Sequence, residues 1–203
     1  MRFKVIAIVA AGLIGGGLLA LAVLPASVTD FLRPQKSWTV GKAAIGGPFE
    51  MIDHSGRAVT DKTFQNTYLL VFFGFTYCPD VCPAALQTVT ATLERLGPKA
   101  NKVSPLFVSV DPERDTPEVL TEYLSNFDDK IVGLTGSSEQ VARMVKTYRA
   151  YARKVDNGSN PDSYTMDHSA FLYLMSPEGE FITHFSPVTS FEKMADRISQ
   201  EMG

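Results

Sequence analysis

The sequence has few cysteines and histidines and no excess of basic residues. Its 203 residues contain two cysteines and three histidines, and the formal net charge is −3 at pH 7. Two cysteines are too few for a disulfide scaffold, which excludes the class of small secreted domains stapled by disulfides. Without a basic excess the chain lacks the charge pattern of nucleic-acid-binding proteins, so we expect no nucleic acid partner. With 45% apolar and 20% charged residues, the composition is that of a folded globular chain.

One long uncharged run lies near the N-terminus. Val5–Leu24 holds about twenty residues without a charge, enough to cross roughly 30 Å of hydrocarbon as a helix. Arg2 and Lys4 precede the run, so the positive-inside rule keeps the N-terminus in the cytoplasm and sends the rest across the membrane. A cleaved signal peptide is the alternative, although its apolar region is usually shorter. The sequence therefore predicts an anchor over residues 1–26, a linker over 27–40 and a globular domain over 41–203.

The rest of the chain alternates between strand and helix patterns. Tyr68–Phe75 is almost continuously apolar and rich in β-forming residues, as in a strand buried on both faces. Turn residues separate paired apolar segments at Asp53–Gly56 and at Pro177–Gly179, which predicts two hairpins. Two further strands are predicted at 106–110 and 131–134, and the turn-rich segment 156–162 is predicted to be an exposed loop.

Four segments have helical patterns. Apolar residues recur at helical spacing after Pro83, which suits the first position of a helix because its missing N–H needs no partner there. Ser137 and Gln140 form a capping-box pattern. The predicted helices are 83–96, a segment from 116 to about 127, a segment after 137, and 191–202. Strand–helix–strand units imply a mainly parallel sheet covered by helices. The predicted fold class is therefore α/β, with a thioredoxin-like sheet, an N-terminal hairpin and the single N-terminal transmembrane helix.

The two cysteines lie four residues apart, where a predicted buried strand gives way to a predicted helix. They belong to the segment Cys78–Pro83, which reads CPDVCP. A helix N-terminus carries partial positive charge and free N–H groups, which favour thiolate over thiol. Ligands in open parallel sheets also bind at the carboxyl ends of strands. Two thiolates placed there can close a disulfide or bind a metal ion. The alternative is a pair of inert buried cysteines.

Two thiolates are soft ligands that suit Cu(I) or Zn(II), and both metals accept imidazole. A structural zinc site needs four protein ligands, so two histidines would have to converge on the cysteines. His54 is predicted in a hairpin turn and His184 in an edge hairpin, so neither is an obvious partner. His168 immediately precedes a predicted strand at 170–175, and its neighbour Asp167 could orient the imidazole. A purely structural role for His168 remains the alternative at this point.

Three other residues near these segments have two interpretations each. Asp80 lies between the cysteines, where it could tune their pKa or meet a partner, or simply belong to the loop or cap. Asp111 follows a predicted strand at the same edge, where it could border the site or end the strand and cap a helix. Met166 offers a thioether two residues before His168, although a methionine usually serves packing.

Five segments, in this order along the chain, resemble the Sco/SenC family. They are Gly46–Phe49 (GGPF), Asp53–Gly56 (DHSG), Phe73–Pro83 (FGFTYCPDVCP), Val108–Pro117 (VSVDPERDTP) and Asp167–Ser169 (DHS). The resemblance covers about residues 46–185. It implies a membrane-anchored, thioredoxin-like copper protein that assists assembly of the CuA centre of cytochrome c oxidase. The family's copper ligands, two cysteines and a distal histidine, carry over onto Cys78, Cys82 and His168.

The resemblance also implies where the protein works and with what. The expected cofactor is a copper ion. The expected partners are the cytochrome c oxidase subunit that carries the CuA site, a copper donor protein, a thiol reductant, and the membrane through the N-terminal helix. The expected location is the bacterial inner membrane, single-pass, with the C-terminal domain on the periplasmic side. The alternative is the mitochondrial inner membrane, facing the intermembrane space.

A thiol–disulfide oxidoreductase is the competing function. Such an enzyme would reduce the cysteines of the oxidase subunit before copper arrives, with Cys78 attacking and Cys82 resolving. The cysteines are spaced C-x-x-x-C, whereas the usual redox spacing is C-x-x-C, and disulfide exchange has no need of His168. The sequence therefore favours copper delivery as the leading function, alone or combined with the reductase activity.

Overall fold

The computed structural model describes residues 44–156, 158 and 164–203. The chain divides into two units, residues 1–41 and 42–203, and the described residues belong to the second. The predicted anchor (1–26) and linker (27–40) lie outside the described residues. Within the part that is described, every helix is too short or too polar to cross a membrane.

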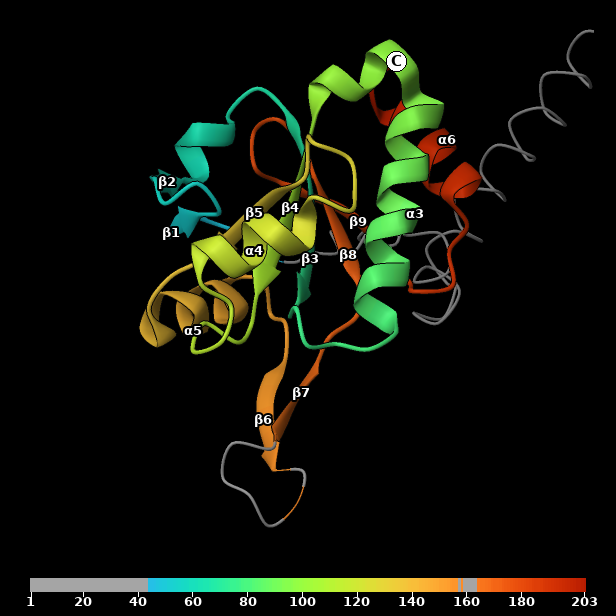
Figure 1. Cartoon of the computed structure of the whole chain (residues 1–203). Coiled ribbons are helices and arrows are strands. Elements are labelled where there is room, and N and C mark those ends of the chain that lie inside the picture. Colours follow the sequence, from blue (N-terminus) through green and yellow to red (C-terminus); the bar gives the residue numbers. More distant parts are fainter. Residues whose placement is uncertain (1–43, 157, 159–163) are drawn as a thin grey trace, which may run out of the picture. The chain divides into compact units, whose positions relative to one another are not determined.

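A seven-stranded sheet forms the centre of the domain (Figure 1). Its strand order is β2-β1-β5-β4-β3-β8-β9. The parallel strands β3, β4 and β5 stand in the middle, and the other neighbours pair antiparallel. The bounds are β1 Glu50–Asp53, β2 Ala58–Thr60, β3 Tyr68–Gly74, β4 Val103–Ser109, β5 Val132–Thr135, β8 Leu172–Met175 and β9 Phe181–Phe185. The buried apolar strand and both hairpins predicted from the sequence are confirmed.

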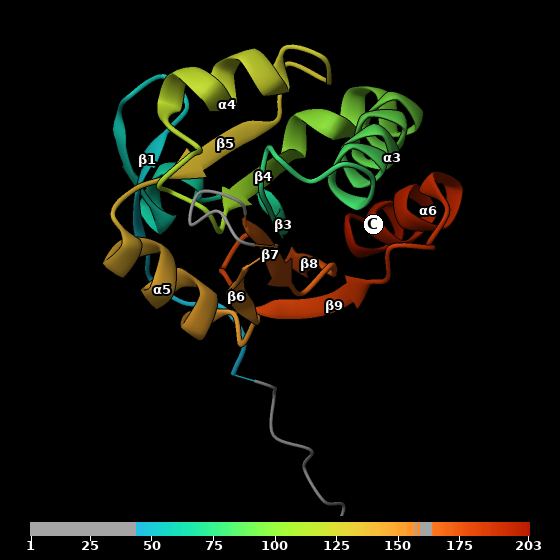
Figure 2. The ribbon, with the colours of Figure 1, turned by 60° about the horizontal axis from the view of Figure 1, so that its bottom comes forward.

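In the described part of the chain, four α-helices cover the two faces of the sheet (Figure 2). They are α3 Val81–Leu96, α4 Pro117–Leu124, α5 Ser138–Thr147 and α6 Phe191–Glu201. A short 3-10 helix, η1 Asp61–Phe64, joins β2 to β3, and another, η2 Gly97–Lys102, joins α3 to β4. Two adjacent residues of β3 point to opposite faces of the sheet. Phe72 contacts Phe107, whose ring meets Tyr123 of α4, whereas Phe73 contacts Tyr148, directly after α5. The alternation of strand side chains thus gives one face to α4 and the other to α5.

Helices α4 and α5 start where the sequence predicts, but α3 does not start at Pro83 as predicted. Thr116 caps α4 and Ser137 caps α5, where Gln140 completes the predicted capping box. Helix α3, however, begins at Val81, so Pro83 is its third residue and not its first. A proline is still tolerated there, because the first four N–H groups of a helix have no intrahelical partner. The earlier start makes Cys82 part of the helix.

A second, two-stranded sheet was not predicted. Strands β6, Ala152–Asp156, and β7, Tyr164–His168, pair antiparallel outside the main sheet and project from one end of the domain (Figure 1). We call this pair the β6–β7 arm. His168 was expected just before a strand, but it is the last residue of β7, and β8 begins at Leu172. Of the loop predicted at 156–162, Asp156 belongs to β6 and Gly158 is described, while the other residues lie outside the described part.

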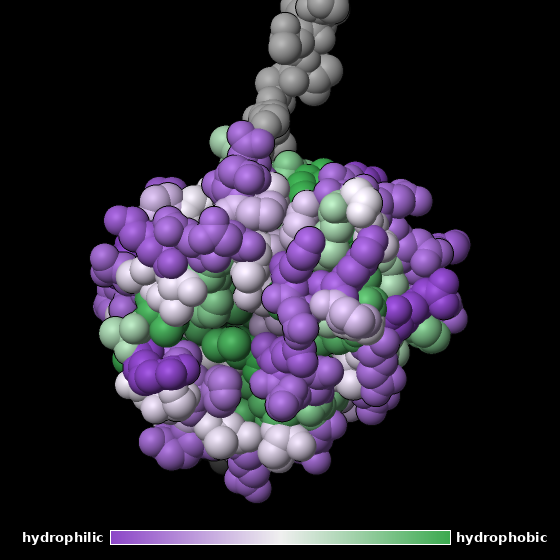
Figure 3. Space-filling model, turned by 90° about the horizontal axis from the view of Figure 1, so that it is seen from above, coloured by the Kyte–Doolittle hydropathy of each residue, from purple (hydrophilic) through white to green (hydrophobic). Residues whose placement is uncertain are grey.

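The apolar side chains gather inside the domain. The most buried belong mainly to β3, β4, β8 and the inner sides of α3 and α6. Figure 3 shows one outer face, on which polar side chains cover most of the area and apolar residues appear in smaller patches between them. Burial of the central strands fixes where their ends lie. Gly74 pairs with Ser109 at the ends of β3 and β4, so the loops after these two strands leave the sheet side by side.

Candidate metal centre

The two cysteines lie where the loop after β3 enters α3. Cys78 belongs to the loop and is partly exposed, whereas Cys82 is the second residue of α3 and is fully buried. The backbone N–H of Cys82 donates to the Sγ of Cys78 at 3.3 Å. The sulfur thus takes the place of a capping side chain, because Asp80, at the N-cap position, is exposed and makes no side-chain cap bond.

His168 reaches the cysteines from the end of β7. Its Nε2 lies 3.7 Å from the Sγ of Cys82, and the ligand atoms of Cys78, Cys82 and His168 all lie within 4.8 Å of one another. Nδ1 lies 3.1 Å from the carbonyl oxygen of Ser169. A carbonyl can only accept, so this contact places the ring proton on Nδ1 and turns the lone pair of Nε2 toward the sulfurs.

The orienting partner of His168 differs from the sequence prediction. The sequence offered Asp167 as a residue that could orient the imidazole, but the carbonyl of Ser169 contacts the ring instead. Neighbouring strand residues point to opposite faces, so Asp167 turns away from the site. Its side chain is 57% exposed and lies 3.9 Å from Arg153 across the β6–β7 arm. Two aromatic side chains, Phe72 and Phe75, meet the imidazole edge-on at 6.3 and 5.7 Å between ring centroids.

Burial sets the protonation state of the inner cysteine. It raises the pKa of the Cys82 thiol far above its ordinary value, and the neighbouring Cys78 and the Asp115 carboxylate act in the same direction. The backbone at Phe75 lowers the pKa, but by less. In the metal-free protein Cys82 is therefore a neutral thiol, and a metal ion that binds its sulfur must displace the proton.

The loop after β4 anchors the cysteine loop through Asp115. This carboxylate is fully buried and accepts hydrogen bonds from the backbone N–H of Thr76 at 3.1 Å and from its hydroxyl at 2.6 Å. The hydroxyl of Ser109 donates to it at 2.6 Å. Burial raises the pKa of Asp115 and outweighs these three bonds. The link fixes the backbone two residues before Cys78.

Asp111 has a role that neither sequence interpretation foresaw. It is 3% exposed, and Thr116, not Asp111, caps the following helix. Its carboxylate receives the Tyr164 hydroxyl at 2.8 Å and pairs with the Arg114 guanidinium. Asp111 therefore joins the loop after β4 to the first residue of β7. The repeat of charged residues in Asp111–Asp115 was visible in the sequence, but Tyr164 carried no signal of its own.

The remaining sequence candidates lie apart from the three converging residues. The Nδ1 of His54 accepts from the backbone N–H of Gly133 at 3.1 Å, and His184 lies between the rings of Phe171 and Phe181. Both placements agree with the expectation that neither histidine is a partner of the cysteines. Met166 packs against the core and borders an apolar groove of about 480 Å³ between α5 and the β6–β7 arm.

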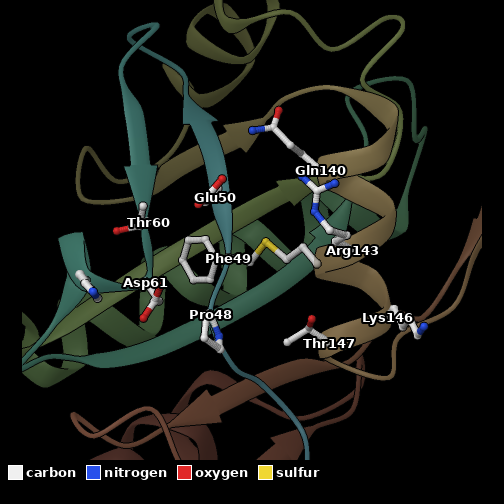
Figure 4. A pocket seen from close by; sticks show the side chains of 11 residues that line it. Pro48, Phe49, Glu50, Thr60, Asp61, Gln140, Arg143, Lys146 and Thr147 are labelled. Carbon is white, nitrogen blue, oxygen red and sulfur yellow. The ribbon is translucent and has the colours of Figure 1, made fainter.

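Another groove is separate from the cysteines. It measures about 540 Å³ and lies between the β1–β2 hairpin and α5, with Phe49, Glu50 and Arg143 among its lining residues (Figure 4). Cys78, Cys82 and His168 do not line it. The three candidate ligand atoms therefore converge at the junction of α3 and β7 and not in this groove. Two sulfurs and one imidazole suit copper, and they are one ligand fewer than a closed structural zinc site requires.

These features define a class: a thioredoxin-like α/β domain with a Cys–Cys–His group at the carboxyl end of its central strand. A model of the SCO1/SenC family matches residues 38–203, and the chain belongs to this family. Among solved structures, Bradyrhizobium japonicum ScoI with copper bound is 44% identical, with a TM-score of 0.72, covering 77% of this chain and 99% of that one. A structure of BsSco, described as a member of the Sco family of cytochrome c oxidase assembly proteins, shares the fold at 23% identity and a TM-score of 0.59, covering 76% of this chain and 91% of that one.

The curated relatives come from mitochondria and from bacteria. Protein sco1 of Schizosaccharomyces pombe is 42% identical over 79% of this chain. The mitochondrial SCO1 homolog of Homo sapiens is 36% identical over 93% of this chain, as is the SCO2-like protein RP587 of Rickettsia prowazekii. The chain spans 62% of the fission yeast protein, 64% of the human protein and 92% of the Rickettsia protein.

Proposed function

We propose that the protein is a copper metallochaperone that binds one copper ion through Cys78, Cys82 and His168 and assists assembly of the CuA centre of cytochrome c oxidase. The observation that carries the proposal is the convergence of the three ligand atoms within 4.8 Å, although His168 follows Cys82 by 86 positions in the sequence. Family membership and the copper-bound relative from Bradyrhizobium japonicum support copper as the metal.

The donor set suits a metal that is bound and then handed on. Thiolates favour Cu(I), and an imidazole adds affinity for Cu(II). Cys78 and His168 are only partly buried, so an incoming thiolate from an acceptor protein can reach the copper. Copper then leaves by stepwise exchange of soft ligands, which needs little driving force because the bonds broken and formed are alike. Three ligands hold the ion while leaving a position for the acceptor.

We further propose the membrane arrangement that the sequence predicts. Residues 1–26 anchor the chain, 27–40 form a linker and 41–203 form the copper-binding domain on the periplasmic side of a bacterial inner membrane. The mitochondrial inner membrane, with the domain in the intermembrane space, is the alternative. The partners are the oxidase subunit that carries CuA, a copper donor and a thiol reductant. An anchor raises the effective concentration of the domain near a membrane-bound acceptor.

A thiol–disulfide oxidoreductase is the second candidate, and the unequal exposure of the cysteines favours it. The thiolate of the accessible Cys78 would attack a disulfide of the target and form a mixed disulfide. The Cys82 thiol would then give its proton to the target thiolate released in the first step and attack Cys78, forming the Cys78–Cys82 disulfide and releasing the second target sulfur. The target gains two electrons and two protons and leaves as a dithiol, and a thiol reductant must restore the protein.

One variant separates the two functions. His168→Ala removes the imidazole and leaves both sulfurs, so a chaperone should lose affinity for Cu(II) and support less oxidase activity in cells. His184→Ala, on the edge strand β9, is the matched control and should change neither. The rate of Cys78–Cys82 disulfide exchange is measured beside metal affinity, since an imidazolium can also tune a thiol. Unchanged Cu(II) affinity and normal oxidase assembly in His168→Ala would overturn the copper assignment and favour the reductase.

A further inference from the structure

The strand that carries His168 is held to the domain by side-chain contacts and not by a strand ladder. The β6–β7 arm shares no ladder with the seven-stranded sheet, so no run of backbone hydrogen bonds fixes its direction. At its base, Ser169 and Tyr151 exchange two hydrogen bonds of 2.9 Å each. These bonds join the two strands of the arm to each other and not to the main sheet. The angle of the arm against the cysteines therefore depends on side-chain contacts farther along the strands.

Arg114 supplies the densest of these contacts. Its Nη1 donates to the backbone carbonyl of Tyr164 at 3.1 Å, and the guanidinium lies over the Tyr164 ring, 3.7 Å from the centroid. Its Nε pairs with Asp111, whose other oxygen accepts the Tyr164 hydroxyl. The guanidinium also lies 4.6 Å from the ring of Tyr77. One side chain thus joins the loop after β4, the first residue of β7 and the neighbour of Cys78.

Tyr164 is the first residue of β7 and His168 is the last. Tyr164, Met166 and His168 alternate onto one face of the strand, as the period of two requires. Tyr164 and His168 are four residues apart, or roughly 13 Å along an extended strand. The contacts that hold Tyr164 against the domain therefore also fix the course of the strand that leads to His168. Phe75 strengthens the connection, because its ring lies 5.7 Å from that of His168 and 5.9 Å from the Arg114 guanidinium.

We propose that Arg114 is a positioning residue of the copper site: by clamping Tyr164 it fixes β7 and aims His168 at the two sulfurs. This inference rests on the proposed copper site. The planar, delocalised guanidinium is essential to it, because a lysine ammonium cannot both stack between rings and donate in two fixed directions. Arg114 touches no proposed ligand directly, so its effect must pass through His168.

The test uses the reduced full-length chain and Cu(II), the oxidation state most sensitive to imidazole. Arg114→Lys should weaken Cu(II) binding about tenfold, as is typical when a residue behind a metal ligand is lost. It should also reduce the nitrogen hyperfine coupling in the electron paramagnetic resonance spectrum. Tyr164→Ala should reproduce both changes, whereas Tyr164→Phe keeps the stacked ring and should stay close to wild type. Arg197→Lys, which alters an arginine on α6 that pairs with Glu201, is the matched control.

A double variant distinguishes positioning from general destabilisation. In the His168→Ala background, Arg114→Lys should have no further effect on Cu(II) affinity, because residues acting through one another are not additive. In the metal-free protein, hydrogen exchange should quicken along β7, while the midpoint potential of the Cys78–Cys82 pair stays as in wild type. Additive losses of Cu(II) affinity in the double variant would overturn the positioning role of Arg114 but leave the proposed copper site intact. Wild-type Cu(II) affinity and spectrum in Arg114→Lys and Tyr164→Ala would do the same. If His168→Ala itself left Cu(II) binding unchanged, the proposed copper site would fail first.

Discussion

The Cβ atom that Gly74 lacks would lie 2.9 Å from the Sγ of Cys82. It would also lie 2.6 Å from Cε2 of Phe107, closer than a carbon atom can approach an aromatic ring. Gly74 is the last residue of β3, and Cys82 packs its buried sulfur directly against this bare stretch of strand. The glycine is therefore part of the site, since any side chain there would displace the inner sulfur from its place beside His168.

Gly74→Ala should accordingly impair both folding and copper binding. Overpacking of this kind costs about 1–3 kcal/mol, measurable as a lower midpoint in urea unfolding. Cu(I) affinity should fall as well, because the Cys82 sulfur moves. Adding Phe107→Leu, which shortens the side chain on the other side of the new methyl group, should restore part of the stability but not the affinity. Unchanged stability and affinity in Gly74→Ala would show that the packing around Cys82 is looser than described.

The carboxylate of Asp53 should make the stability of the domain depend on pH in the acid range. Burial alone would raise its pKa, but hydrogen bonds from Ser55 and Arg57, through both side chain and backbone, lower it to about 2. A carboxyl group in an unfolded chain titrates near pH 3.9. Because the folded pKa is the lower one, the stabilisation is complete above about pH 5 and is lost as the pH falls toward 2.

Asp53→Asn should therefore cost about 2 kcal/mol at pH 7, and its difference from wild type should vanish as the pH approaches 2. Urea unfolding across this range measures the effect. Asp129→Asn, at an exposed position, is the control and should shift stability little at either end. A difference that stays constant with pH would show that the charge of Asp53 contributes nothing to folding.

The two cysteines should differ in reactivity. Cys78 is partly exposed, whereas Cys82 is fully buried and burial raises its pKa. At pH 7 iodoacetamide should alkylate Cys78 at least about ten times faster than Cys82, because the thiolate is the reactive species. Peptide mapping by mass spectrometry at timed intervals measures the two rates, and Cys78→Ser provides the slow reference. Equal rates, or a faster Cys82, would contradict the assigned order of attack and resolution.

The sequence predicted the middle of the fold well because burial governs it. The long apolar run in β3 is stable only as a strand covered on both faces. The sequence therefore also predicted that the cysteines lie where this strand leads into a helix. The capping pair Ser137 and Gln140 is equally local, since its hydrogen bonds span three residues. Elements set by local pattern and burial were therefore foreseen.

The β6–β7 arm was not foreseen because its sequence has no strand pattern. Its residues are mostly exposed or half-buried, and β6 carries the charged pair Arg153 and Lys154. The arm is stabilised by contacts between distant parts of the chain, such as Lys154 with Glu113 at 3.0 Å. The orientation of His168 could not be predicted either, because it also depends on the geometry of this arm. Asp167 follows from the sequence as a residue that could orient the imidazole, but the strand geometry turns its side chain away.

The most direct test of the copper site is X-ray absorption at the copper edge on the reduced full-length chain titrated with Cu(I) under anaerobic conditions. The titration should end at one copper per chain, and the spectrum should fit two sulfur ligands and one nitrogen ligand. Cys82→Ser should lose one sulfur, and His168→Ala should lose the nitrogen while both sulfurs remain. A spectrum without sulfur, or one unchanged in Cys82→Ser, would contradict the assignment of Cys78, Cys82 and His168 as the copper ligands.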